Sequence, residues 1–130
     1  MCIRDSTYIA YCFHPVEGMT AVTTYVGTAS NPGPFVYLGF RPEFLMLREY
    51  STVDSWGIYD EDRLGYNLDS AGNAVLYVEW NGAEEAQATR AIDLLSNGFK
   101  LRTNNPTFNG TGNYLCLAFA KSPFKTSNAR

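Results

Sequence analysis

The chain has 130 residues and a formal charge of −3, from ten Lys and Arg against thirteen Asp and Glu, and it carries one His and three Cys. This length suits a single domain with one core, and a hydrophobic content of 45% excludes a wholly disordered chain. Charged residues reach only 18% and aromatic residues 15%, which is typical of a β-rich binding or structural domain. The mildly acidic balance argues against nucleic-acid binding, and no apolar run approaches the ~20 residues of a membrane span.

Short runs of β-branched, aromatic and alternating residues predict strands along most of the chain. In chain order these are residues 7–13, 20–27, 35–40, 44–50, 55–59, 74–80 and 114–121. In the fourth of them, Leu45, Leu47 and Glu49 should share one face. The last is apolar on both faces, which indicates a central position in its sheet. Only residues 83–91 have a helix-forming composition, and a helix of nine residues needs packing to be stable.

A β-hairpin is predicted by the Asn-Gly sequence at 97–98, which lies between two strand-like runs and is preferred in type I′ turns. The cross-strand pairs that follow are Ser96 with Phe99, Leu95 with Lys100, Leu94 with Leu101, and Asp93 with Arg102. Leu94, Phe99 and Leu101 then share a face, which we expect to be buried. Asp93 and Arg102, which carry opposite charges, are expected to pair on the other face.

About eight short strands, separated by turns rich in Gly, Pro or Asn, predict an all-β fold. The expected architecture is an antiparallel β-sandwich of jelly-roll type in a single domain. Because the first and last strands are both strongly apolar, we expect the two ends of the chain to lie close together within the sheets.

The cysteines Cys2, Cys12 and Cys116 are odd in number and lack a C-x-x-C spacing, so they indicate neither a zinc site nor a disulfide framework. Cys12 and Cys116 lie in apolar segments, where small buried side chains are expected. Cys12 and His14 would face the same side of a strand, but without a third, orienting group a catalytic dyad is not favoured. A single His also excludes a His-rich metal site within one chain.

The densest acidic run is Asp60-Glu61-Asp62. Asp60 and Asp62 have the spacing of a glycosidase pair, with Trp56 nearby as a possible sugar platform, but a solvated loop is the favoured interpretation. Asp60, Asp62 and Asp69 are hard oxygen ligands of the type that calcium prefers, yet their spacing matches no known loop, so we predict no metal site. Trp56 itself is expected in the core. No G-x-S-x-G motif occurs, and the residues form no catalytic constellation, so we expect neither an enzyme nor a cofactor.

Five ordered sequence blocks carry a resemblance to a known family. They are Tyr11–Gly18, Gly33–Tyr37 with Gly39–Pro42, Trp56–Asp60 with Arg63 and Tyr66-Asn67, Leu95–Arg102, and Ala118–Lys125 with Asn128–Arg130. In these blocks residues 7–130 resemble uncharacterised domains found at the C-terminal ends of bacteriophage tail-fibre and other structural proteins. The chain departs from that pattern at Glu43-Phe44, where the family has a small residue and Trp, and at Cys116, where Tyr is more common. Residues 1–6 look like translated adapter sequence from metagenomic assembly, in which case the domain ends a longer protein.

The resemblance implies a place in the virion, on the phage tail, and an extracellular role in contact with a host cell-surface glycan or protein. The loops at 63–73 and 104–112 are then the expected binding loops, with Arg63, Tyr66 and Trp80 as candidate contacts. For Arg63 and Tyr66 the favoured interpretation is that they organise their own loop, whereas Trp80 could equally belong to the core. The alternatives are a carbohydrate-active or lectin-like sandwich and a purely structural domain. A fibre protein of this type could also form a homotrimer through a fibre region upstream of this domain.

Overall fold

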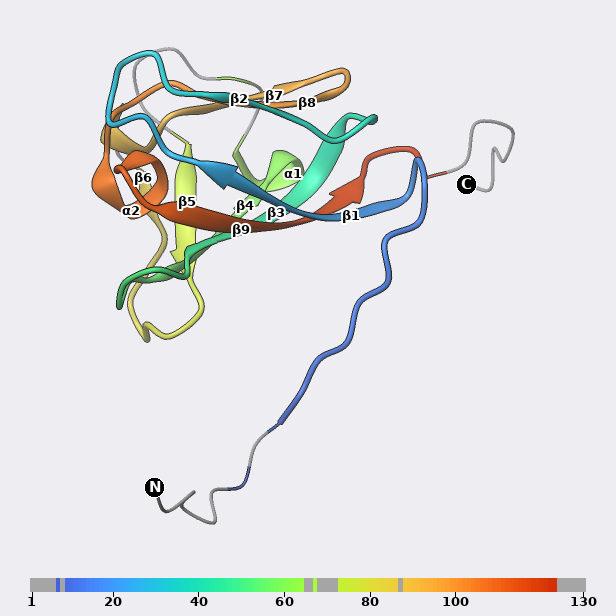
Figure 1. Ribbon diagram of the computed structural model, residues 1–130, viewed down its shortest axis with the longest axis horizontal. Coiled ribbons are helices and arrows are strands. Elements are labelled where there is room, and N and C mark those ends of the chain that lie inside the picture. The colour runs from blue at the N-terminus through green and yellow to red at the C-terminus, as the bar shows by residue number, and fades with distance from the viewer. Residues whose placement is uncertain (1–6, 8, 65–66, 68–72, 87, 124–130) are drawn as a thin grey trace.

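A computed structural model describes residues 7, 9–64, 67, 73–86 and 88–123, which form two antiparallel sheets packed face to face (Figure 1). The six-stranded sheet has the order β1 (Thr20–Val26), β9 (Asn113–Ala120), β3 (Pro42–Glu49), β4 (Trp56–Asp60), β5 (Ala74–Tyr77) and β6 (Glu85–Ala86). The three-stranded sheet has the order β2 (Phe35–Tyr37), β8 (Gly98–Leu101) and β7 (Ile92–Leu95). The short helices are α1 (Glu61–Leu64), the 3-10 turn η1 (Ala88–Arg90) and α2 (Pro106–Asn109). The prediction of an all-β sandwich is therefore confirmed.

β9 is a central strand, as its apolar sequence predicted. It pairs with β1 on one side and β3 on the other, so the first and last strands of the fold are neighbours. Its inward side chains Tyr114, Cys116 and Ala118 are completely buried. The predicted alternation in β3 is also confirmed, because Leu45 and Leu47 are fully buried between the sheets.

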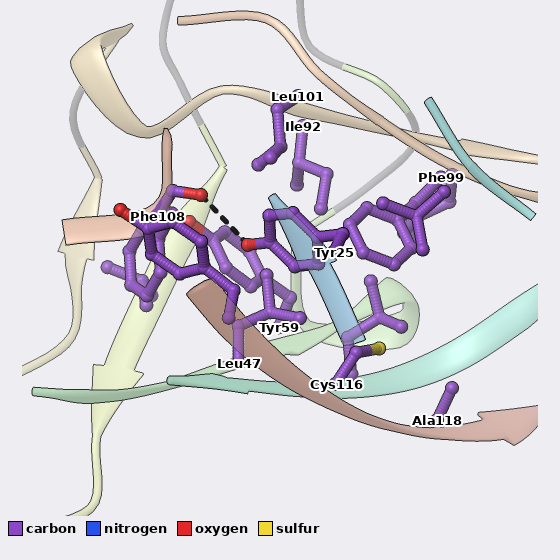
Figure 2. Packing of buried hydrophobic residues seen from close by; sticks show 14 of the residues in the cluster. Tyr25, Leu47, Tyr59, Ile92, Phe99, Leu101, Phe108, Cys116 and Ala118 are labelled. Carbon is purple, nitrogen blue, oxygen red and sulfur yellow. Dashed lines mark hydrogen bonds between the residues drawn. The ribbon is translucent and has the colours of Figure 1, made fainter. Parts of the chain in front are cut away.

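An aromatic cluster forms the centre of the core (Figure 2). The Tyr25 ring stacks on Tyr114 with 4.9 Å between centroids and meets Phe99 edge-on at 5.9 Å. The Tyr25 hydroxyl donates a hydrogen bond of 2.8 Å to the carbonyl of Phe108, as the dashed line in Figure 2 shows. Burial raises the pKa of the neighbouring Cys116 thiol to about 12, so this thiol stays protonated at neutral pH.

The β7–β8 hairpin forms, but its predicted register is wrong by two residues. Leu95 pairs with Gly98 and Leu94 with Phe99, so the turn consists of Ser96 and Asn97. Gly98 does not have the positive φ expected of a type I′ turn. A glycine is required here because a Cβ would overlap the carbonyl oxygen of Val36 in the adjacent β2.

A shift of two residues leaves every side chain of the hairpin on its predicted face. Leu94, Phe99 and Leu101 are accordingly buried, as expected. Asp93 and Arg102 form the predicted ion pair, although their backbones are not directly opposite each other.

The strand expected at residues 7–13 does not form in the described part of that segment, which runs away from the body of the domain (Figure 1). The ladder that would continue this segment along β1 ends at its base. The hydroxyl of Thr20 donates to the carbonyl of His14 and accepts from the N–H of Val16, and the antiparallel bridge stops at Val16 and Thr20. As a result Cys12 is exposed, so its expected burial is wrong.

One further expectation about local structure is corrected, and a second segment is partly buried. Within the described residues of 83–91 there is no α-helix, but a short strand β6 and the turn η1. The expected binding loop at 104–112 contains α2, whose residues Phe108 and Asn109 are buried. The side chains of Phe108 and Asn109 therefore belong to the core. No helix among the described residues is long and apolar enough to cross a membrane.

Candidate binding surface on the six-stranded sheet

The outer face of the six-stranded sheet carries an apolar groove of about 880 Å³. Its lining residues come from five strands or their ends and from the N-terminal segment: Ile9, Tyr11, Cys12, Phe13, Val22, Met46, Trp56, Val78, Leu115 and Leu117. One wall is thus the sheet and the other is the segment at 9–13. The Phe13 ring meets Phe119 edge-on at 6.0 Å, which holds the base of this segment against the sheet.

Trp56 lies on this outer face and is half-buried, so its expected place in the core is wrong. The reason is the alternation of β4, in which Gly57 and Tyr59 face inward. Gly57 leaves room for the Phe108 ring, and the neighbouring Trp56 therefore faces outward.

A second, more polar hollow of about 390 Å³ adjoins Trp56, and we call it the Trp56 pocket. Its lining residues are Arg48, Val53, Asp54, Ser55, Trp56 and Glu79. The guanidinium of Arg48 lies 4.7 Å from the centroid of the Trp56 ring, a cation–π contact. The Glu79 carboxylate accepts a hydrogen bond of 3.2 Å from the N–H of Trp56. These contacts hold an aromatic ring and charged groups of both signs at one place on the sheet.

Glu79 remains ionised in this pocket. Partial burial acts against its charged form, but hydrogen bonds from Ser55 and Trp56 and the charge of Arg48 outweigh it and lower the pKa of Glu79. The group is therefore suited to accept hydrogen bonds from a ligand, whereas a general acid requires a raised pKa.

Of the candidate contacts proposed from sequence, Arg63 and Trp80 line neither hollow, and Tyr66 lies outside the described residues. Arg63 forms an ion pair of 3.1 Å with Glu84 and donates to the carbonyl of Ile58 at 3.4 Å. Trp80 is 49% exposed, and its ring packs against Tyr77 with 4.6 Å between centroids. Through its ion pair with Glu84, Arg63 joins α1 to the segment before β6.

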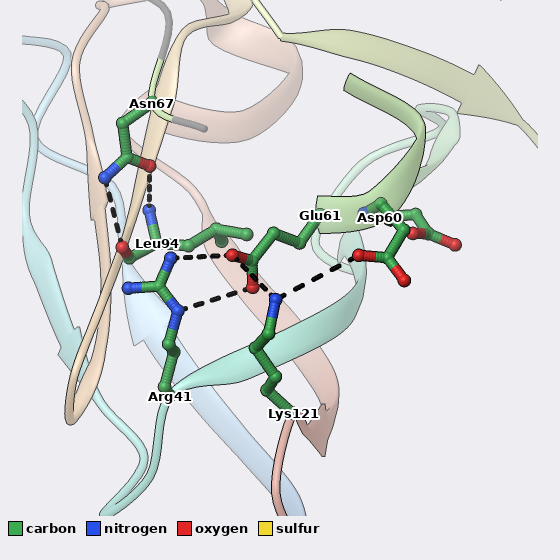
Figure 3. A network of polar contacts seen from close by, with 7 residues as sticks. Arg41, Asp60, Glu61, Asn67, Leu94 and Lys121 are labelled. Carbon is green, nitrogen blue, oxygen red and sulfur yellow. Dashed lines mark hydrogen bonds and ion pairs between the residues drawn. The ribbon is translucent and has the colours of Figure 1, made fainter. Parts of the chain in front are cut away.

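The acidic run at 60–62 has a structural role at Glu61 (Figure 3). This carboxylate is 9% exposed and forms ion pairs with Arg41 at 2.9 Å and Lys121 at 3.1 Å. The Asp60 carboxylate accepts a hydrogen bond of 3.0 Å from the N–H of Asp62 at the start of α1. Across the described residues no group of three His, Cys, Asp or Glu side chains could hold a metal ion, and the third candidate ligand, Asp69, lies outside them.

We expect Glu61→Gln to lower the free energy of unfolding at pH 7 by about 1–3 kcal/mol, because it breaks a buried ion pair whose cationic partners are partly exposed. The hydrogen bond from Arg41 holds the pKa of the Glu61 carboxyl below the usual value of a glutamate. The stabilisation is therefore complete above the pKa of the unfolded chain and is lost as the pH falls through the lower, folded-state pKa.

Urea unfolding at pH 7 and in acid measures this effect, and the difference between wild type and variant should shrink in acid. The matched control is Asp62→Asn, since the Asp62 side chain is 75% exposed and lies 4.0 Å from Lys121. A Glu61→Gln deficit that stayed constant with pH would contradict the assignment.

Asn67 ties the segment after α1 to the smaller sheet. Its side-chain amide accepts a hydrogen bond of 2.8 Å from the N–H of Leu94 and donates one of 3.2 Å to the Leu94 carbonyl (Figure 3). Leu94 lies in the edge strand β7, so the amide takes the place of a further strand. The φ of 36° at Asn67 is in the left-handed region that Asn tolerates better than most residues. Sequence reasoning did not single out this contact.

Comparisons with known proteins give a family but no described activity. A domain of unknown function, DUF7483, matches residues 2–123. No curated protein and no solved structure matches the chain. Since the match spans most of the sequence, the chain belongs to the DUF7483 family of domains of unknown function.

Proposed function

We propose that this domain is a non-catalytic module of a bacteriophage virion, of the tail-fibre type, that contributes to recognition of the host cell surface. The five sequence blocks that resemble C-terminal domains of phage structural proteins support the place in the virion. The Trp56 pocket supports the binding role, and it is the observation on which the proposal depends. Arg48 lies in β3 and Trp56 in β4, so these two side chains stand on paired strands of the sheet, while the other lining residues come from the β3–β4 loop and the turn after β5.

A glycan is the ligand class that fits this pocket. Sugars offer apolar C–H faces that pack on aromatic rings and hydroxyl groups that bond to carboxylates and guanidinium groups. Trp56 supplies the ring, while Glu79 and Arg48 supply an acceptor and a donor. The volume of about 390 Å³ lies within the usual range of small-molecule sites. Trp80 follows Glu79 in the chain and is half exposed, so it remains a candidate further contact.

The second candidate is a free-standing lectin-like or carbohydrate-active sandwich. Glycoside hydrolysis requires one carboxyl group with a raised pKa to protonate the leaving oxygen. The lowered pKa of Glu79 opposes this role, and it favours binding over hydrolysis at the Trp56 pocket.

The test is binding of the full chain to an array of bacterial surface glycans, followed by titration of each positive glycan. We expect Glu79→Gln to weaken binding about tenfold, since it removes one charge-assisted hydrogen bond at almost unchanged size. Glu84→Gln is the matched control, because Glu84 is exposed and pairs with Arg63 outside the pocket.

Three outcomes would count against the proposal. An array without any bound glycan would refute the glycan ligand, and unchanged binding by Glu79→Gln would remove the Trp56 pocket as its site. Release of reducing sugar from a bound glycan would favour the carbohydrate-active alternative.

A further inference from the structure

We propose that the N-terminal segment of one copy covers the apolar groove of a second copy, and that the two copies exchange these segments reciprocally to form a dimer. We call residues 9–15 the arm. The inference uses the apolar groove and does not depend on the ligand proposed for the Trp56 pocket.

The arm is an apolar segment with no partner of its own size. Ile9 and Tyr11 are each 81% exposed and Phe13 is 52% exposed, and all three lie at alternate positions. The sequence is that of a strand, yet residues 9–15 make no ladder in the structure. Such a segment exposed to water favours association.

Local chemistry directs the arm away from the strand that follows it in the same chain. A hairpin continued beyond the bridge at Val16 and Thr20 would place the arm along β1. The next ladder bond would use the carbonyl of His14, and this carbonyl accepts a hydrogen bond of 2.9 Å from the Thr20 hydroxyl instead. β1 is an edge strand of the six-stranded sheet, and the arm leaves the body near the N-terminal end of this strand (Figure 1).

The groove and the arm match in charge. The arm of the same chain forms one wall of this groove, and the other wall is the sheet. None of the lining residues on the sheet side is charged, and residues 9–15 contain no Lys, Arg, Asp or Glu. In the sheet wall, Val22 is 41% exposed and Met46 is half-buried. A neutral apolar hollow of this kind favours a neutral apolar occupant, and every copy of the chain carries one.

The area involved is sufficient for a stable dimer. From their exposed fractions, and with about 150–250 Å² for a buried aromatic side chain, Ile9, Tyr11 and Phe13 together offer roughly 400 Å². Covering them buries a similar area of the partner's groove, so two reciprocal contacts bury about 1,600 Å², the size of a standard stable interface. Because each copy supplies one arm and one groove, a two-fold arrangement closes without leaving either surface free.

Cysteine cross-linking between two distinguishable copies tests the exchange directly. One copy carries a size tag, keeps Cys12 in its arm and has Cys2→Ser. The other has Cys2→Ser and Cys12→Ser, and Met46→Cys places its only accessible thiol in the groove; the buried Cys116 stays protonated in both. On mild oxidation of the mixture we expect a disulfide-linked heterodimer. Val53→Cys in place of Met46→Cys is the control, because Val53 is exposed and lies outside the groove.

Sedimentation of the untagged chain gives the second measurement. We expect Tyr11→Asp to weaken self-association at least tenfold, and Val22→Asp to do the same from the opposite wall. Tyr37→Asp should leave association unchanged, since Tyr37 is 68% exposed on the other sheet.

Two results would overturn the proposal. The first is a chain that stays monomeric at high concentration, with no heterodimer cross-link. The second is an efficient cross-link only when Cys12 and Met46→Cys are in the same chain, which would show that the arm closes on its own groove. Glu79→Gln should not change association, so failure of the glycan proposal is distinguishable from failure of this one.

Discussion

Replacing Asn109 by Leu should lower the free energy of unfolding by about 3–5 kcal/mol, although the two side chains have almost the same shape. Asn109 is completely buried at the end of α2. Its amide oxygen accepts from the N–H of Thr28 at 2.8 Å, and its amide nitrogen donates to the carbonyls of Ser30 at 2.9 Å and Thr103 at 2.7 Å. Leu would leave these three backbone groups without their partner in a site it still fills.

Urea unfolding measures this loss, and Asn105→Ala is the control in the same segment. Asn105 caps α2 by accepting from the N–H of Thr107 at 3.0 Å, and loss of such a cap costs about 1 kcal/mol. If Asn109→Leu were no more destabilising than Asn105→Ala, the amide would not be the group that holds these segments together.

The second large effect is expected at Phe108, where truncation to Ala should cost about 3–5 kcal/mol. The ring is 2% exposed and meets Tyr59 edge-on at 5.5 Å. It also lies against Gly57, where a Cβ would overlap two carbon atoms of the ring. Gly57→Ala alone should therefore cost about 1–3 kcal/mol through overpacking.

The two changes should not add. In the Phe108→Ala background the new methyl at position 57 enters the space that the ring leaves, so the double variant should be more stable than the sum of the single effects by about 1–2 kcal/mol. A double-mutant cycle by urea unfolding measures this coupling. Additive effects would contradict the direct contact between the ring and the glycine.

These two residues also explain why part of the segment at 104–112 belongs to the core. Its length and its Asn and Gly content are typical of an exposed loop, and those features are local. Burial of Phe108 and Asn109 depends on β4 and on residues 28–30, which are distant in the sequence. The Trp56 pocket was missed for a similar reason, because Arg48 in β3 and Glu79 in the turn after β5 are far apart in the sequence and meet only in the folded domain.

The all-β class, the positions of most strands and the buried faces of β3 and of the β7–β8 hairpin follow from the sequence alone. These properties follow from an alternation with a period of two residues, which is local and survives a register shift of two, as Leu94 and Phe99 show. Tertiary structure decided the hairpin register, where close approach of Val36 selects Gly98, and it decided that the apolar arm leaves the sheet at Pro15. It also assembled the groove and the Trp56 pocket, because contacts between segments far apart in the chain depend on packing of the whole domain.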